Sequence, residues 1–378
     1  MSIPFNFPYY TDRELETIQM AMATGQLQGD CGFTKKCHAL LETRYGCKKA
    51  LLTHSCTGAL EMTAILLDIK PGDEFIVPSY TFVSTANAFV LRGGVPVWCD
   101  IRPDTLNIDE TKIEALITPK TKAIVPVHYA GVACEMDTIL NIADKHKLFV
   151  VEDAAQGVEA FYKNKPLGTL GHFGCYSFHN TKNYSCGEGG ALLVNDERFI
   201  ERASVIREKG TNRSLFLMGH VDKYTWVDHG SSFLPSDLAA AFLLSQLEES
   251  DVINQKRLAV WNRYYELLMP ISEKHGFRLP VVPNGCGHNA HMFYILLPTA
   301  QQRSELLKHL NSAGIMATFH YIPLHSAPMG KKIQPKEFSL PITDDLSARL
   351  IRLPMYAGLT EEQIQVIVRC IREFIAST

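Results

Sequence analysis

Residues 148–190 read LFVVEDAAQGVEAFYKNKPLGTLGHFGCYSFHNTKNYSCGEGG, and this stretch decides the fold class. Its first four residues, 148–151, form an apolar run that is typical of a strand buried in a parallel sheet. Glu152 and Asp153 therefore fall at the carboxyl end of that strand, where open α/β sheets place their ligands. Because Asp153 is poorly placed to be a surface charge, we predict that it is a buried functional carboxylate.

Three further features follow Asp153 in the same stretch. Gln156 comes three residues later, and a second short run at 174–178 leads to Lys182 and then to the glycine-rich segment 187–190. A buried carboxylate, an amide and a lysine beyond a strand end are the groups needed to hold pyridoxal phosphate (PLP). The carboxylate keeps the pyridine nitrogen of PLP protonated, and the lysine amine bonds covalently to its aldehyde.

Each of these residues also has an ordinary structural explanation. An Asp at a strand end is more often a helix cap or a loop hydrogen-bonding group, and a Lys after a strand is usually solvated. Only the combination of Asp153, Gln156 and Lys182 within one short segment favours the cofactor. The sequence therefore predicts a PLP site from the set of residues and not from any one of them.

Small residues at the start of an expected helix provide a place for the cofactor phosphate. Residues 53–58 read THSCTG, and apolar residues recur at helical spacing from Ala59 onward. Free backbone N–H groups and the positive end of the helix dipole favour a phosphate at such a helix start. Thr57 and Gly58 are therefore predicted to bind the phosphate, and a plain helix cap is the alternative.

The chain resembles the DegT-type family of PLP-dependent nucleotide-sugar aminotransferases over nearly its whole length. The motifs that carry the resemblance are Gly29-Asp30, PSYTF at 78–82, HYAG at 128–131, EDAAQ at 152–156, SFHNTK at 177–182, GEGG at 187–190 and HYIPLH at 320–325. The resemblance implies the aspartate aminotransferase-like α/β fold (PLP fold type I), a mostly parallel sheet with helices on both faces plus a smaller C-terminal α+β domain. We expect the large PLP-binding domain, with the N-terminal segment, at 1–250 and the small domain at 251–378.

The order of the expected elements also leads to an α/β fold. Short strands are predicted at 75–77, 95–99, 123–127, 148–151, 174–178 and 191–194, and helices at 33–45, 109–117, 135–145, 236–247 and 252–274. Strands that alternate with helices favour a mostly parallel sheet covered on both faces. In the C-terminal part we predict strands at 291–297 and 315–320, and a final helix that begins with a capping box formed by Thr360 and Gln363.

The resemblance implies a role for each candidate site residue. The residues implied to bind the cofactor are Thr57, Gly58, Phe82, Asp153, Gln156, Ser177, Lys182 and Ser232, and those implied to bind the substrate are His320, Tyr321 and His325. Lys182 is implied as the catalytic residue, and Gln156 is implied to hydrogen-bond the ring oxygen. Phe82 is implied to stack on the pyridine ring, for which a core aromatic is the alternative.

A long segment at 209–230 indicates a homodimer. It is rich in Gly, Arg and aromatic residues, and loops of this length are usually functional or lie at an interface. In the family, a residue from this neighbourhood reaches into the other subunit and touches the cofactor phosphate. Ser232 stands where the usual pattern has an asparagine. We therefore expect a homodimer with two shared active sites.

The resemblance implies a nucleotide-linked 4-oxo sugar as amino acceptor and L-glutamate as amino donor. Segments 207–213 and 230–234 are most similar to those of the enzymes that act on TDP-4-oxo-6-deoxy-D-glucose in enterobacterial common antigen synthesis. Another nucleotide-linked oxo sugar is one alternative, and a non-catalytic binding or regulatory protein with the PLP fold is another. A dehydratase of the same fold is disfavoured, because those relatives have a histidine where Lys182 stands.

Composition excludes several other classes of protein. The 378 residues are 46% hydrophobic and 20% charged, with a net charge of −3, which is typical of a globular protein without a nucleic-acid-binding surface. No apolar stretch reaches the roughly 20 residues that a membrane helix needs, and the start lacks a secretory signal, so we expect a cytoplasmic protein. The ten cysteines include no CxxC pair, and the histidine pairs lack further ligands at zinc spacing. We expect reduced thiols and no metal site.

Overall fold

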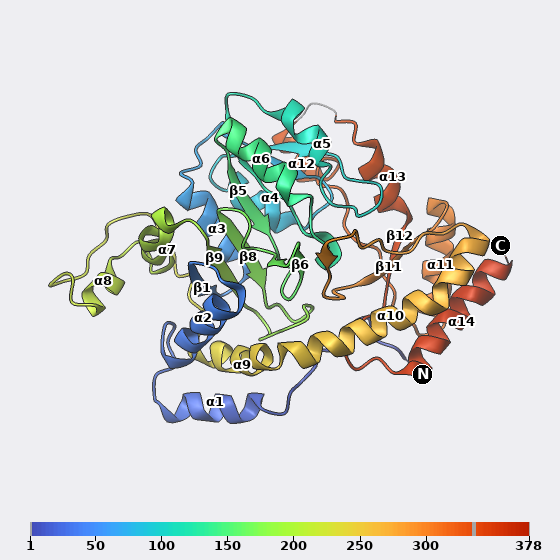
Figure 1. Ribbon diagram of the computed structural model, residues 1–378, viewed down its shortest axis with the longest axis horizontal. Helices are drawn as coiled ribbons and strands as arrows, with labels where there is room; N and C mark the ends of the chain where they lie inside the picture. Colours follow the sequence, from blue (N-terminus) through green and yellow to red (C-terminus); the bar gives the residue numbers. More distant parts are fainter. Residues whose placement is uncertain (1, 335–337, 378) are drawn as a thin grey trace.

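The computed structural model describes residues 2–334 and 338–377, and its centre is a seven-stranded sheet (Figure 1). In spatial order its strands are β1 (Lys49–Thr53), β9 (Gly190–Val194), β8 (Phe173–Ser177), β5 (Phe149–Asp153), β4 (Thr121–Ile124), β2 (Glu74–Pro78) and β3 (Val95–Cys99). The pairings that join β8, β5, β4, β2 and β3 are parallel, whereas β9 runs antiparallel to both of its neighbours. The mostly parallel sheet predicted from the sequence is confirmed.

Helices cover both faces of this sheet, as predicted. One face packs against α3 (Cys56–Leu66), α4 (Val83–Val90) and α7 (Ile200–Arg207), and the other against α2 (Gly32–Tyr45), α6 (Met136–His146) and α9 (Asp237–Glu248). Side chains alternate between the two layers, so that Leu51 and Leu192 join one core and Leu52 and Leu193 join the other. Strands buried on both faces are continuous apolar runs, and this explains why the sequence predicts them well.

A second apolar core is formed by the C-terminal elements, which lie together on the right of Figure 1. Its elements are α10 (Ser250–His275), β11 (Phe293–Leu296), α11 (Ala300–Ser312), β12 (Leu350–Leu353) and α14 (Glu361–Ser377). β11 and β12 pair antiparallel. Thr360 and Gln363 exchange both hydrogen bonds of the predicted capping box ahead of α14, at 3.0 and 3.2 Å. The division of the chain at residue 250 stays a prediction.

The strand predicted at 315–320 is wrong. Within the described residues, this segment makes two isolated bridges, from Ile315 to Ile3 and from Thr318 to Arg352. It is followed by Tyr321, whose φ of +49° lies in the left-handed region, so the chain turns where a strand would continue. The alternation of apolar residues reflects burial, since Ile315 is 1% exposed, and not a regular hydrogen-bonded ladder.

The remaining elements surround these two cores. They include α1 (Glu14–Ala23), which lies along α9, α5 (Glu110–Ile113), α8 (Arg213–Leu217), α12 (Pro328–Ile333), α13 (Pro341–Arg349) and a small sheet of β6 (Phe161–Tyr162), β7 (Lys165–Pro166) and β10 (Cys286–Gly287). The segment that carries α8 extends away from the body at the left of Figure 1. All ten cysteines are free thiols. No helix of residues 2–334 and 338–377 is long and apolar enough to cross a membrane.

Candidate active site

Asp153 ends β5 and lies over the carboxyl ends of the parallel strands. Its side chain is buried, with Oδ2 accepting a hydrogen bond from Thr85 Oγ1 at 2.6 Å and Oδ1 accepting one from the Ala155 N–H at 3.1 Å. Thr85 belongs to the first turn of α4, so this helix helps to fix the carboxylate. A carboxylate offers about four acceptor sites, and Asp153 therefore keeps capacity for a ligand N–H group.

Glu152, the preceding residue, is committed to the fold. Its fully buried carboxylate accepts hydrogen bonds from the backbone N–H groups of Gly168, Leu170 and Gly171, at 2.8, 2.7 and 2.6 Å. The same carboxylate lies 2.8 Å from His128 Nε2. Successive strand residues point to opposite faces, so the two neighbouring carboxylates serve different purposes. Glu152 holds the 168–171 loop, and Asp153 faces the candidate site.

Lys182 lies in the loop between β8 and β9. The loop is closed by backbone hydrogen bonds, including one at 2.8 Å from the Lys182 N–H to the carbonyl oxygen of His179. The Nζ amine has no hydrogen-bond or ion-pair partner in the part of the chain that the structure describes. Burial lowers the pKa of this amine, although Cys56 and Asp153 act in the opposite direction. A lysine amine of lowered pKa is suited to covalent chemistry with an aldehyde.

The lowered pKa of Lys182 predicts how its reaction with PLP depends on pH. Only the neutral amine attacks an aldehyde, and the neutral form predominates above the pKa. We therefore expect the rate at which the cofactor-free protein combines with PLP to reach its plateau at a lower pH than that of a free lysine side chain. Stopped-flow absorbance across a pH series measures this rate, with a blocked lysine amino acid as reference. Equal midpoints for the two amines would contradict the prediction.

The start of α3 provides polar groups for an anion. Ser55 caps the helix and accepts a hydrogen bond from the Gly58 N–H at 3.1 Å, so this N–H is already used. The Thr57 N–H has no partner among the described residues, and Thr57 Oγ1 lies 2.8 Å from Ser84 Oγ. Ser177 ends β8 and receives a long contact of 3.4 Å from the His179 N–H. A phosphate here would use the N–H of Thr57 in preference to that of Gly58.

Phe82 presents an exposed aromatic ring beside this site. It immediately precedes α4, its side chain is 55% exposed, and its ring centre lies 6.3 Å from that of Tyr321. The alternative that Phe82 is a core aromatic is therefore wrong. A ring that the protein leaves uncovered, next to the helix that holds Asp153, can stack on a flat ligand.

The Gln156 side chain is largely occupied by contacts within the chain. Its Oε1 accepts a hydrogen bond from the Ala130 N–H at 2.7 Å, and its Nε2 donates one to Tyr321 Oη at 3.0 Å. One N–H of the amide remains for a ligand, because the amide group carries two donors. Gln156 therefore joins the 128–131 loop to Tyr321 and can offer one hydrogen bond to a cofactor oxygen.

The two histidines predicted to bind substrate have protein partners. His320 Nδ1 lies 2.8 Å from Tyr129 Oη, and burial lowers the pKa of His320 well below the usual histidine value. His325 Nδ1 lies 2.7 Å from Ser79 Oγ, and its Nε2 lies 3.3 Å from Asp344 Oδ1. His320 is therefore neutral at physiological pH. Both residues therefore fix the segment that carries Tyr321, and their contact with a substrate stays a prediction.

Ser232 is exposed, and the next residue, Phe233, lies close to the start of α3. Ser232 forms an isolated bridge with Glu208, and the carbonyl oxygen of Phe233 accepts a hydrogen bond from the His54 N–H at 2.8 Å. The segment around Ser232 therefore borders the helix start predicted to bind phosphate. The other subunit is not needed for this contact between Phe233 and His54.

Sequence reasoning missed two residues of this site. Thr85 follows the PSYTF motif by three positions, and the turn into a helix could have identified it as a polar group near Asp153. Arg352 lies in β12, and the charge on it influences the Lys182 amine. Its neighbours in sequence, Ile351 and Leu353, are core residues, so the local pattern gave no sign of a site. The proximity of Arg352 to the site is evident only from the packing of β12 near residues 320–321.

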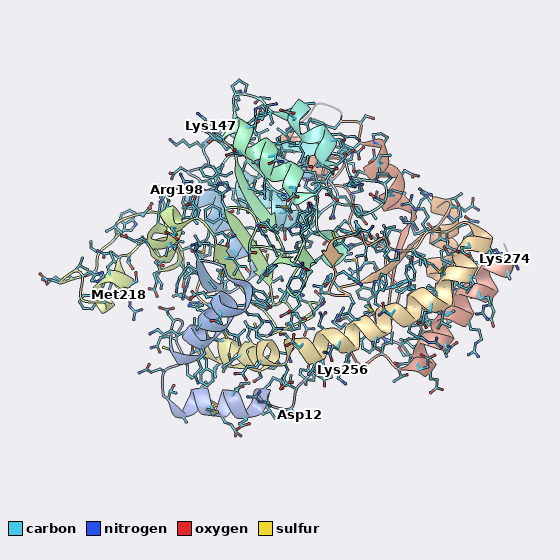
Figure 2. All side chains as sticks on the ribbon, viewed as in Figure 1. Asp12, Lys147, Arg198, Met218, Lys256 and Lys274 are labelled. Carbon is cyan, nitrogen blue, oxygen red and sulfur yellow. The ribbon has the colours of Figure 1, made fainter. Side chains whose placement is uncertain are left out.

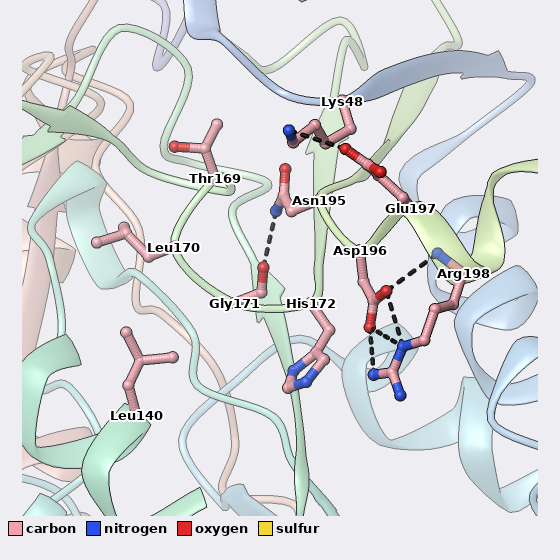
Figure 3. Close-up of a pocket in the computed structure, with 10 residues that line it drawn as sticks. All are labelled: Lys48, Leu140, Thr169, Leu170, Gly171, His172, Asn195, Asp196, Glu197 and Arg198. Carbon is pink, nitrogen blue, oxygen red and sulfur yellow. Dashed lines mark hydrogen bonds and ion pairs between the residues drawn. The ribbon is translucent and has the colours of Figure 1, made fainter. Parts of the chain in front are cut away.

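A surface groove elsewhere on the protein does not coincide with this site (Figure 3). It is lined by residues that precede β8, such as His172, and by residues 195–198, which follow the antiparallel β9. These positions are at the end of the sheet opposite to Asp153. Ion pairs occupy some of its polar side chains, including one at 2.9 Å between Lys48 and Glu197. The candidate residues thus lie at the carboxyl ends of the strands and not in this groove.

Comparison with known proteins identifies the family. The profile of the DegT/DnrJ/EryC1/StrS aminotransferase family matches residues 8–372. The chain belongs to this family. This DegT-family chain is 32% identical over 384 residues to the spore coat polysaccharide biosynthesis protein SpsC of Bacillus subtilis (strain 168), covering 99% of this chain and 97% of the relative.

Solved structures agree with the family assignment. The aminotransferase TlmJ of Streptoalloteichus hindustanus matches with a TM-score of 0.92 and 27% identity over 100% of both chains. Helicobacter pylori PseC, an aminotransferase involved in the biosynthesis of pseudoaminic acid, matches with a TM-score of 0.90 and 25% identity, also over 100% of both chains. PLP fold type I is therefore confirmed. The DegT-family chain is a PLP-dependent sugar aminotransferase.

The contacts of Asp153 predict the effect of removing its charge. In an Asp153→Asn variant of this aminotransferase, an amide oxygen can still accept from Ala155 and an amide N–H can donate to Thr85 Oγ1. An opposite charge nearby shifts the pKa of a group by about 1–3 units. Without the carboxylate, the pyridine nitrogen of PLP would lose its proton that much more readily, so turnover should fall by about 10- to 1000-fold. Steady-state kinetics measures the loss, and an unchanged unfolding temperature would show that the fold is intact. Turnover equal to that of the wild type would contradict this role.

Proposed function

We propose that this aminotransferase transfers the amino group of L-glutamate to C4 of TDP-4-oxo-6-deoxy-D-glucose. The products are TDP-4-amino-4,6-dideoxy-D-galactose and 2-oxoglutarate, and the place in metabolism is polysaccharide synthesis such as that of enterobacterial common antigen. The observation that carries the aminotransferase chemistry is the unpartnered Lys182 amine within electrostatic range of Asp153. The names of SpsC and PseC, which refer to polysaccharide and pseudoaminic acid synthesis, support a carbohydrate acceptor.

We infer the roles of the residues from their positions. PLP, when bound, supplies an electron sink for the carbon that loses its proton. Asp153 holds a proton at the pyridine nitrogen, and Phe82 covers one face of the ring and excludes water. Thr57 and Ser177 bind the phosphate. Lys182 Nζ takes the proton from the donor Cα, and in the second half of the reaction it returns a proton to C4 of the sugar.

Two spectroscopic steps test the proposal. The visible absorbance band of the PLP-loaded protein should disappear on addition of L-glutamate and return on addition of TDP-4-oxo-6-deoxy-D-glucose, with the amino sugar identified by NMR. If the band returns only with a different nucleotide-linked oxo sugar, the proposed acceptor is wrong and the proposed transamination stands. A band insensitive to every amino acid would favour the alternative of a binding or regulatory protein.

We also propose that the active form is a homodimer in the cytoplasm, with the 209–230 segment at the interface. Met218 and Trp226 on this segment are 67% and 76% exposed, and Figure 2 shows the Met218 side chain on the part that extends from the body. Exposed apolar side chains gathered on one segment are typical of interaction surfaces. Sedimentation of the wild type and of a Trp226→Glu variant tests this assembly. A fully active monomer would contradict it.

A further inference from the structure

His291 contacts the residue next to Lys182 from a distant part of the chain. Its Nδ1 lies 2.9 Å from Asn183 Oδ1, and Asn183 Nδ2 donates a hydrogen bond to the carbonyl oxygen of Asn289 at 2.8 Å. The side chains of Asn183, Asn289 and His291 are all buried. Asn183 belongs to the loop between β8 and β9, whereas His291 lies just ahead of β11. These two hydrogen bonds therefore join the Lys182 loop to the segment that leads into β11.

The direction of the hydrogen bonds assigns the proton on the His291 ring. Asn183 uses its N–H group toward Asn289, so its oxygen faces His291 and accepts from the Nδ1–H. Burial, together with the charges on Lys182 and Arg257, lowers the pKa of His291 well below the usual histidine value, so the ring is neutral at physiological pH. The single ring proton therefore lies at Nδ1, where it holds Asn183, and Nε2 carries none.

The turn that carries His291 is fixed by further contacts. Ala290 has a φ of +49°, in the left-handed region that residues other than glycine adopt only when the surrounding structure imposes it. Arg257 on α10 donates to the carbonyl oxygens of Ala290 and His291, at 3.2 and 2.8 Å. Asn289 donates to the carbonyl oxygen of Gln156 at 2.7 Å and accepts from the His291 N–H at 3.0 Å. The turn is therefore a rigid support for the groups that it contacts.

We propose that His291 is a positioning residue for Lys182 and acts through Asn183, an inference that rests on the proposed role of Lys182 as the PLP-binding amine. Within residues 2–334 and 338–377 the Lys182 amine has no hydrogen-bond partner, so its place depends on the backbone around it. The Lys182 N–H is bonded to the carbonyl oxygen of His179, and the next residue is held by His291. Release of Asn183 would free one end of this loop and admit water to the amine.

Water at the Lys182 amine would change its pKa, and this change is measurable. Burial is the main reason why the pKa of the amine lies below the ordinary lysine value. The titratable groups that face the amine are Cys56 on α3, Asp153 at the end of β5, Arg352 on β12, His291 and His320. Because His291 is neutral, its replacement by a neutral side chain leaves the charges around the amine as they are. Only the hydration of the amine changes, so its pKa should rise.

The test measures how fast the full-length protein, after removal of PLP, combines with added PLP across a pH series. Three substitutions separate the two ring nitrogens: His291→Asn keeps an N–H at the position of Nδ1, His291→Gln places one at that of Nε2, and His291→Leu has neither. The control is His172→Leu, which removes a histidine that accepts from the Val150 N–H at 3.1 Å at the opposite end of the sheet. Unfolding temperatures establish that each variant is folded.

We expect His291→Leu and His291→Gln to raise the pH midpoint of this rate by about one unit, a fraction of the shift of up to about 3–5 units that full burial produces. The plateau rate should fall by about 10- to 100-fold, because a small misplacement of a reacting group has an effect of this size. His291→Asn and the control should keep the midpoint of the wild type. If the Leu and Gln variants do not fold, Asn183→Ala, which removes the acceptor instead of the donor, should show the same upward shift.

Midpoints equal to that of the wild type in the folded Leu, Gln and Ala variants would overturn the inference, even if the variants unfold at lower temperatures. A midpoint restored by Gln and not by Asn would also overturn it, because Nε2 would then be the nitrogen that matters. Failure of the proposed role of Lys182 looks different. The wild type and Lys182→Ala would then combine with PLP equally fast, and the proposed function would fall together with this inference.

Discussion

Replacing Lys182 by Ala is expected to abolish transamination. The amine is both the point of covalent attachment of PLP and the group that moves the proton, so one substitution removes both functions. Turnover should fall by about 10⁴-fold or more, the upper end of what one acid–base group contributes. Product formation measured over hours, together with the absorbance response to glutamate, gives the size of this loss.

The structure provides a control for the Lys182→Ala experiment. Because the Lys182 amine has no partner among the described side chains, the variant should unfold at the temperature of the cofactor-free wild type. Lys274→Ala changes an exposed lysine near the end of α10 and should leave turnover unaltered (Figure 2). Turnover of Lys182→Ala within about tenfold of the wild type would be incompatible with the proton-transfer role.

Replacing Glu152 by Ala is expected to destabilise the fold strongly. The substitution leaves the N–H groups of Gly168, Leu170 and Gly171 without their acceptor and His128 without its partner, all inside the protein. Breaking a buried charge network of this kind costs about 3–5 kcal/mol in the free energy of unfolding. Urea denaturation measures the loss, and a lower denaturation midpoint with an unchanged slope would identify it as a loss of stability.

A surface carboxylate serves as the matched control for Glu152→Ala. Glu114 also contacts two basic groups, Lys145 and His146, at 2.6 and 2.8 Å, but in solvent. Exposed ion pairs contribute little to stability, so Glu114→Ala should leave the urea midpoint unchanged. Equal midpoints for the two variants would mean that the hydrogen bonds of Glu152 do not support the 168–171 loop in solution.

The sheet was predictable because its strands are buried on both faces. Such strands are unbroken apolar runs, and this holds for β9, which is predicted at 191–194 and observed at Gly190–Val194 with every residue buried. The segment 315–320 is also mostly apolar, but its Met316 and Phe319 side chains are about half exposed, and its backbone pairs with Ile3 and Arg352 at single positions. Local sequence reports burial, whereas a ladder depends on a partner strand elsewhere in the chain. This difference explains the strand that was predicted in error.

The positions of the candidate residues were predictable where they depend on single strands and not where they depend on tertiary contacts. Asp153 ends β5 and Lys182 lies in the loop that follows β8, so both positions follow from the sheet. The sequence could not show that Ser55 uses the Gly58 N–H, or that the amide of Gln156 bonds Tyr321. It also gave no sign of Arg352, because proximity to Lys182 arises only when the C-terminal core packs against the sheet.

The pairing of β1 with the antiparallel β9 affects the order in which the protein folds during synthesis. β1 is an edge strand whose partner is β9, and Thr53 at its end pairs with Gly190. During synthesis β1 emerges early, yet it has no place in the sheet until β9 leaves the ribosome. The helix start after β1 and the Lys182 loop before β9 therefore meet in a late, long-range folding step. We therefore expect PLP to bind after that step and, by binding the folded state alone, to stabilise it.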